Sequence, residues 1–81
     1  MDEIQLDSTL VGAVIAEFRQ KRGLSQEVVS GLAVIGRTHL SAIERGERKP
    51  TLETFFRICS AMNVPASSVM AEIERKIREN D

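Results

Sequence analysis

Signals that begin and end helices recur along this chain and divide it into segments too short for anything but a small bundle of helices. Ser25 and Thr51 can cap helix N-termini, and Gly23 and Gly46 suit the left-handed conformation in which helices commonly end. Pro65 suits the first turn of a helix, where no N–H is needed. These signals predict an all-α fold of five helices and no strands, over about 9–22, 25–34, 36–46, 51–63 and 65–79.

Apolar residues recur at helical spacing within these segments and predict which faces are buried. In the first segment, which Ser8 is expected to cap, Val11, Val14, Ile15 and Phe18 form one stripe. The inward positions predicted for the other four segments are Val29, Ala33, Leu40, Ile43, Leu52, Phe55, Ile58, Cys59, Met62, Val69, Met70, Ile73 and Ile77. The spacing of Cys59 favours a buried, inert thiol over a redox sensor.

The length of 81 residues leaves room for one domain, predicted over 1–81, with one hydrophobic core. One cysteine and one histidine allow no intramolecular disulfide and no Cys/His metal set, and no cofactor is expected. The acidic N-terminal residues lack an apolar run and no stretch approaches transmembrane length, so a cytoplasmic protein without a signal peptide is expected. No cluster of acid–base groups points to an enzyme.

Charge is distributed unevenly, although the net charge of −1 is unpromising for a nucleic-acid-binding protein. Residues 1–18 carry four acidic and no basic side chains, whereas residues 19–49 carry seven basic and three acidic ones. Residues 50–81 carry four basic and five acidic side chains. The bases therefore gather in the middle of the chain, which indicates a surface that can contact phosphate while the rest stays acidic.

A tight corner near residues 34–36 joins two short helices into a helix-turn-helix over about 25–46. Such a corner lets the second helix protrude, and a helix about 10–12 Å wide fits the major groove of DNA. The outward positions of that helix carry hydrogen-bonding side chains of the types that contact bases and phosphates, namely Arg37, Thr38, His39, Ser41 and Arg45. The pattern makes DNA binding a hypothesis, and a resemblance strengthens it.

Three stretches of sequence carry that resemblance: GLSQE at 23–27, RTHLSAIERGERKPTLETFFRI at 37–58 and NVP at 63–65. Together they resemble the Xre family of helix-turn-helix regulators, which shares the fold of lambdoid phage repressors and Cro, over about residues 10–70. The resemblance implies a lambda-repressor-like five-helix domain that binds double-stranded DNA as a transcriptional regulator, either a repressor or a dual activator-repressor. Small standalone relatives include phage repressors, antitoxins and controller proteins of restriction-modification systems.

The resemblance also implies roles for individual residues. The side chains that would face the groove and read bases are Arg37, Thr38, His39 and Ser41. Those that would contact phosphate are Gln26, Arg45, Arg48 and Lys49, of which Gln26 would also brace the recognition helix. Arg19 and Glu44 would form a structural ion pair between the first helix and the end of the recognition helix. A partly packed surface histidine at His39 stays open as an alternative, as does solvated charge in the basic loop.

The sequence departs from the family pattern at the corner. The family usually has glycine where Val34 stands, and serine or a similar residue where Gly36 stands. A β-branched residue with positive φ is strained, so either the corner is built differently or Val34 is held under strain. Val28 and Leu32 lie on a face that the family leaves polar, and we expect them to pack under the N-terminal arm or to form a second contact surface.

The fifth helix carries an apolar stripe that extends beyond the part needed for the resemblance. Ile73 and Ile77 on this extension predict a seam between two copies of a two-fold homodimer, which would bind a pseudo-palindromic operator. The alternative function is a protein-interaction module with the same fold, such as an antitoxin or another partner-binding regulator. The acidic isoelectric point and the apolar Val28 and Leu32 favour this alternative.

Overall fold

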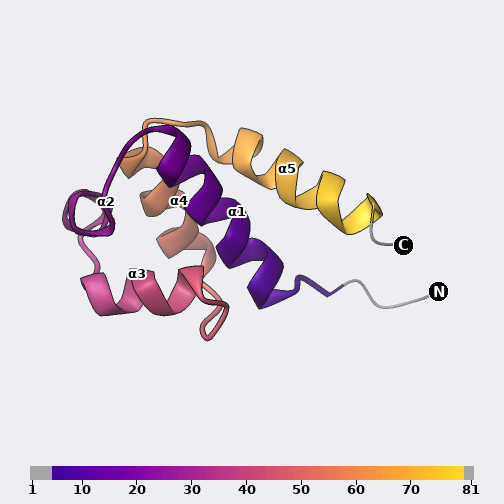
Figure 1. Ribbon diagram of the computed structural model, residues 1–81, viewed down its shortest axis with the longest axis horizontal. Coiled ribbons are helices and arrows are strands. Elements are labelled where there is room, and N and C mark those ends of the chain that lie inside the picture. The colour runs from indigo at the N-terminus through magenta and orange to yellow at the C-terminus, as the bar shows by residue number, and fades with distance from the viewer. Residues whose placement is uncertain (1–4, 80–81) are drawn as a thin grey trace.

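Five α-helices account for most of residues 5–79, the part of the chain that this computed structural model describes, and no strand occurs within it (Figure 1). The helices are α1 (Ser8–Lys21), α2 (Gln26–Ala33), α3 (Arg37–Glu44), α4 (Leu52–Ala61) and α5 (Ala66–Glu79). The predicted all-α, five-helix fold is confirmed. Residues 1–4 and 80–81 of the predicted domain lie outside the described residues.

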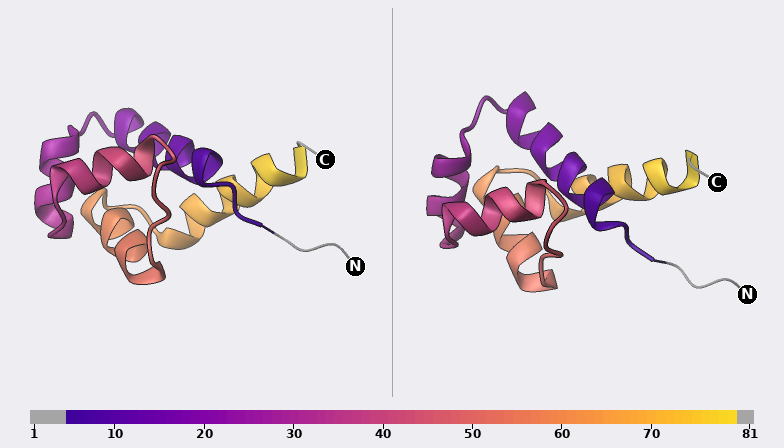
Figure 2. Two further views of the ribbon diagram at one scale, coloured as in Figure 1. Left: turned by 90° about the horizontal axis from the view of Figure 1, so that it is seen from below. Right: turned by 60° about the horizontal axis from the view of Figure 1, so that its bottom comes forward.

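The helices surround a core to which all five contribute. Helix α1 packs against α3 and α5, while α2 packs against both α3 and α4, and α4 also contacts α5. When the molecule is seen from below, α3 lies at the surface in front of α1, and α5 extends past the other helices at one end (Figure 2). The arrangement therefore leaves one long face of α3 uncovered.

Polar side chains and left-handed residues set the ends of the helices. Ser25 Oγ accepts a hydrogen bond from Val28 N at 3.0 Å, and Thr51 Oγ1 accepts one from Thr54 N at 3.0 Å, as predicted. The prediction that Ser8 caps α1 is wrong, because the Asp7 carboxylate one residue earlier accepts from Thr9 N at 2.9 Å and Ser8 lies inside the helix. The left-handed residues at the ends of α1 to α4 are Gly23, Val34, Gly46 and Asn63.

The buried face of each helix follows the predicted spacing with one exception. The fully buried large side chains include Ile15, Leu40, Ile43, Ile58, Met62, Val69 and Ile73. Leu52, which was expected to be inward, begins α4 and is 80% exposed, because the helices packed against α4 leave its side chain uncovered. Cys59 is buried, and burial raises the pKa of its thiol to about 11, as expected of an inert core cysteine.

Helix α5 belongs to the core of the protomer itself. Ile73 is completely buried and Ile77 is half-buried against the core. The sequence assigned both residues to a seam between two copies, whereas the protomer core already covers Ile73 completely and Ile77 in part, since helical spacing shows which residues are inward but not what covers them. Within residues 5–79, no helix is long and apolar enough to cross a membrane, and no cluster of His, Cys, Asp or Glu is placed to hold a metal ion.

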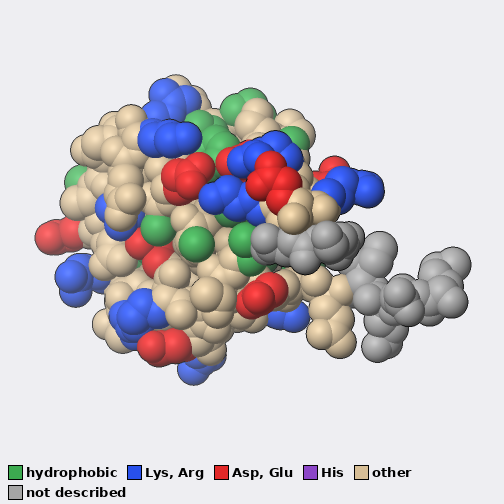
Figure 3. Space-filling model, turned by 45° about the vertical axis from the view of Figure 1, so that its right-hand side comes forward, with side chains coloured by type: hydrophobic (Ala, Val, Ile, Leu, Met, Phe, Trp, Pro, Cys, Tyr) green, Lys and Arg blue, Asp and Glu red, His purple; other side chains and the backbone are tan. Residues whose placement is uncertain are grey.

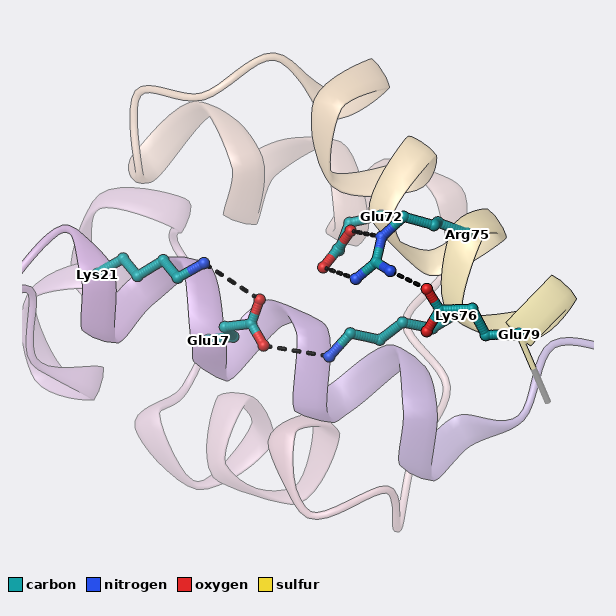
Figure 4. Close-up of polar contacts among 6 residues, drawn as sticks. All are labelled: Glu17, Lys21, Glu72, Arg75, Lys76 and Glu79. Carbon is teal, nitrogen blue, oxygen red and sulfur yellow. Dashed lines mark hydrogen bonds and ion pairs between the residues drawn. The ribbon is translucent and has the colours of Figure 1, made fainter.

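An ion-pair cluster joins the outer side of α5 to α1. Glu17 lies between two lysines, with Lys76 Nζ at 3.1 Å and Lys21 Nζ at 3.4 Å from its carboxylate oxygens (Figure 4). Arg75 pairs with Glu72 at 2.7 Å and also with Glu79. Basic and acidic side chains are accordingly interleaved on the side of the molecule shown in Figure 3, and this face offers no uniformly positive patch for DNA.

Candidate nucleic-acid interface

The end of α3 is seated directly on the backbone of α1. A Cβ atom at Gly12 would lie 2.1 Å from the carbonyl oxygen of Ile43 and 2.7 Å from that of Glu44, so only glycine fits at this position. After the helix, Gly46 has φ +80° and passes so close to Thr9 that a Cβ would lie 2.7 Å from its Cα. The close approach fixes α3 against α1. Sequence reasoning missed Gly12, although a glycine between the buried Val11 and Val14 was the available signal.

A hydrogen-bonded triad fixes the inner side of α3 to both preceding helices. Arg19 forms a bidentate pair with Glu44, with Nε at 2.7 Å from Oε2 and Nη2 at 2.9 Å from Oε1. Arg19 Nη1 also donates to the Leu24 carbonyl at 2.8 Å. Gln26 Nε2 donates to Glu44 Oε1 at 3.0 Å. The structure thus brings together the three predicted residues Arg19, Glu44 and Gln26. The side-chain amide of Gln26 braces α3 through its bond to Glu44.

The corner before α3 contains Val34, for which the sequence left two conformations open. Val34 adopts φ 58° and ψ 47°, the left-handed conformation, and its side chain is 77% exposed. Its N–H donates to the Gly31 carbonyl at 3.2 Å, and Ile35 N donates to Ser30 O at 3.0 Å, which closes the end of α2. Of the two alternatives, the chain keeps the usual corner with Val34 held in it. The strain costs about 1–3 kcal/mol.

The outward face of α3 presents the side chains predicted to read bases. Arg37, Thr38 and His39 are exposed in the first turn, and Ser41 is half-buried one turn further. Leu40 and Ile43 point inward and are fully buried, which fixes this orientation. A shallow concavity along the face is lined by Thr38, His39, Ala42, Arg45, Glu47 and Arg48. The face is therefore polar, shallow and open to solvent.

The basic residues after α3 differ from one another. Arg45 pairs with Glu47 in a fork, with Nε at 2.8 Å from Oε2 and Nη2 at 3.1 Å from Oε1, and its Nη1 also donates to Ser41 Oγ. Arg48 and Lys49 are exposed and form no ion pair within the described residues. Among residues 5–79, Arg45 thus has an ion-pair partner, whereas Arg48 and Lys49 have none. Sequence reasoning assigned no role to Glu47 and missed this pairing.

Two exposed apolar pairs flank the interface. On α4, Leu52 and Phe56 are 80% and 61% exposed. On α2, Val28 and Leu32 are also exposed, so in the described residues they do not pack under the N-terminal arm. Leu6 of that arm instead lines an apolar cavity of about 200 Å³ together with Leu52, Phe55 and residues of α5.

Comparison with known proteins relates this geometry to helix-turn-helix regulators. A helix-turn-helix family model matches residues 15–69. An uncharacterized HTH-type transcriptional regulator, y4dJ of Sinorhizobium fredii, is 38% identical over 55 residues, which are 68% of this chain and 71% of that protein. The transcriptional regulator ClgR of Mycobacterium tuberculosis is 35% identical over 71 residues, and the match spans 86% of this chain but only 63% of ClgR.

Solved structures of similar shape include two restriction-modification controller proteins. C.AhdI from Aeromonas hydrophila has a TM-score of 0.75 and 26% identity, covering 80% of this chain and 98% of its own. A variant of C.Esp1396I has a TM-score of 0.86 and 25% identity, covering 95% of this chain and 100% of its own. The shared shape extends over nearly the whole length of these small proteins.

Proposed function

The chain belongs to the Xre-like helix-turn-helix family of transcriptional regulators, and we propose that it binds operator DNA as a homodimer and acts as a repressor or dual activator-repressor. The observation that carries the proposal is the outward face of α3. Arg37, Thr38 and His39 are exposed on a helix whose inner face is fixed to α1 and α2. A helix held rigidly with such side chains outward suits the major groove.

The proposed contacts divide by position. Arg37, Thr38, His39 and Ser41 lie on α3 itself, where side chains can reach base edges. Arg48 and Lys49 lie in the loop beyond α3, where they would contact phosphate only. Gln26, which lies N-terminal to the corner, would donate to phosphate through the second N–H of Nε2, the one that its bond to Glu44 leaves free.

The exposed apolar side chains of α4 make this helix a better candidate for the dimer interface than the end of α5. Leu52 lines the apolar cavity at Leu6, and Leu52 and Phe56 are exposed apolar side chains of α4, so this surface suits a two-fold contact between identical copies. Ile77, which is half-buried, remains a proposed contact, whereas the buried Ile73 would act only through the protomer fold. A two-fold dimer of this class places its recognition helices about 34–36 Å apart. The operator would then be a pseudo-palindrome with half-site centres about ten base pairs apart.

The binding test compares a base-reading residue with a phosphate-contacting one. After selection of an operator from random duplexes, Arg37→Ala should relax the preference at one base pair per half-site, losing about 1–3 kcal/mol of discrimination. Lys49→Ala should weaken the operator and a scrambled duplex equally and lower the salt slope by about one. Equal losses on both duplexes for Arg37→Ala would remove it from base reading. Absence of wild-type duplex binding at low salt would favour the protein-interaction module.

The dimer test uses charge on the exposed faces of two helices. Leu52→Asp with Phe56→Asp should give a folded monomer by sedimentation, because neither side chain is in the core. Leu32→Asp is the matched control, since Leu32 is equally exposed on α2 and outside the proposed contact. A wild-type protein that sediments as a monomer at high micromolar concentration would contradict the dimer.

A further inference from the structure

The ion pair between Arg45 and Glu47 lies within the surface proposed to meet DNA. Arg45 is the C-cap residue directly after α3, and Glu47 follows in the loop. Both side chains are more than half exposed, and both line the concavity along the outward face of α3 with Thr38, His39 and Arg48. Pairing lowers the pKa of the Glu47 carboxyl, chiefly through its hydrogen bonds with Arg45, so the carboxylate is charged at neutral pH.

The hydrogen bonds of Arg45 restrict what else its guanidinium can bind. A guanidinium has five N–H donors, arranged so that an edge with two parallel donors grips a carboxylate or a phosphate. The edge formed by Nε and Nη2 is occupied by Glu47, and one Nη1 donor is directed to Ser41 Oγ. While Glu47 holds the Nε–Nη2 edge, Arg45 cannot offer that edge to phosphate, and three of its five donors are already engaged.

A carboxylate at this position opposes DNA in either outcome. If Arg45 turns to a phosphate, Glu47 is left unpaired beside the polyanion. If Arg45 stays with Glu47, the pair carries no net charge and the protein makes one phosphate contact fewer. Both outcomes weaken binding to DNA of any sequence. The bond to Ser41, which lies on the base-reading face, gives the paired Arg45 a fixed place at the operator.

We propose that Glu47 is a specificity-determining residue, which withholds Arg45 from the phosphates of non-specific DNA and holds it beside Ser41 for the operator. The inference rests on the proposed function, because it concerns the same surface. It assigns a purpose to an acidic residue inside a basic loop. Glu47 acts through Arg45 and is therefore a positioning residue. Its role is measured by the salt dependence of DNA binding as well as by affinity.

The experiment replaces Glu47 by its neutral isostere. Glu47→Gln should bind a scrambled duplex about three- to tenfold more tightly at low salt, with a salt slope steeper by about one unit. Operator binding should tighten less, because the variant also loses the support that holds Arg45 at Ser41, so the ratio of specific to non-specific affinity falls. In an Arg45→Ala background, the same substitution should no longer steepen the slope.

The control removes the same charge elsewhere. Glu74 pairs with Arg78 at 3.2 Å on the exposed side of α5, and Glu74→Gln should leave slope and ratio at wild-type values. If Glu47→Gln matches Glu74→Gln, or weakens binding to both duplexes, the inference is wrong while the proposed function stands. If the wild-type protein binds no duplex at low salt, the proposed function fails first and the inference with it.

Discussion

Two arginine–glutamate pairs meet the end of α3, one facing α1 and the other facing solvent. The Glu44 side chain is 6% exposed and accepts bonds from Arg19 and Gln26, whereas the Glu47 side chain is 59% exposed and pairs with Arg45 alone. The two forks have nearly the same bond lengths. Bond lengths therefore do not distinguish the two pairs. They differ in their exposure to solvent, and this exposure sets the role of each pair.

The difference follows from the cost of breaking each pair. Removing one partner of a buried pair leaves a charge without water or counter-charge, whereas an exposed charge is rehydrated and screened by salt. The inner pair can therefore stabilise the fold, and the outer pair is free to be exchanged for a ligand. Four adjacent residues, from Glu44 to Glu47, thus serve both the inner support of α3 and its outer contacts.

The inner face should fail most severely at Gly12. Gly12→Ala forces a methyl group into the carbonyl oxygens of Ile43 and Glu44, and it should cost about 3–5 kcal/mol of unfolding free energy or prevent folding. Gly31→Ala is the control, because a Cβ there meets no atom within 4 Å and α2 should gain about 0.5–1 kcal/mol. Urea unfolding measures both. Equal midpoints for the two variants would refute the close contact.

The two glutamates themselves provide the direct comparison. Glu44→Ala should cost about 3–5 kcal/mol, because it strands Arg19 in a mostly buried position. Glu47→Ala should leave the unfolding midpoint close to the wild-type value, because the exposed Arg45 that it leaves behind is rehydrated. In a double-mutant cycle, Arg19→Ala with Glu44→Ala should cost less than the sum of the single changes. Additive losses would mean that the inner pair is not a coupled unit.

The corner that leads into α3 should respond in the opposite direction. Val34→Gly removes the steric strain of a left-handed β-branched residue whose exposed side chain contributes little to the core. The variant should be more stable by about 1 kcal/mol, although glycine adds some freedom to the unfolded chain. A lowered thermal midpoint would show that the exposed Val34 side chain stabilises the corner by more than its strain costs.

A small effect should also come from an ion pair of intermediate burial. The Glu17 side chain is 33% exposed, and its hydrogen bond with Lys76 lowers its pKa below the usual 4.5. Its contribution is therefore complete above pH 4.5 and is lost as the pH falls through the lowered pKa. Glu17→Gln should cost about 0.5 kcal/mol at pH 7 and progressively less as the pH falls below 4.5. A deficit that persists at pH 2 would indicate a role other than charge.

Helix spacing and end signals predicted the fold because they act locally. Ser25, Thr51 and Gly46 perform the functions expected of them, as does the apolar stripe of α1. Asp7 displaced Ser8 because two neighbouring residues were both able to cap, and spacing does not choose between them.

Predictions that depended on neighbouring elements succeeded less well. Leu52 is exposed and Ile73 is buried because the helices packed against them, and not their own spacing, determine what is covered. Gly12 and Glu47 were missed for the same reason, since each matters through a contact that spacing does not show. Gly12 meets the backbone of α3, and Glu47 pairs with the side chain of Arg45. The resemblance compensated where a pair was part of the family pattern, as with Arg19 and Glu44.

The burial of Cys59 makes chemical modification a measure of opening in this chain. Its single thiol is 1% exposed, so an alkylating reagent reaches it only in molecules whose core has opened. The rate of labelling then gives the fraction of open molecules without any engineered probe. A duplex that binds only the folded chain would slow labelling by the factor 1 + [DNA]/Kd. Occupancy of the outward face of α3 could thus be read from a sulfur atom inside the core.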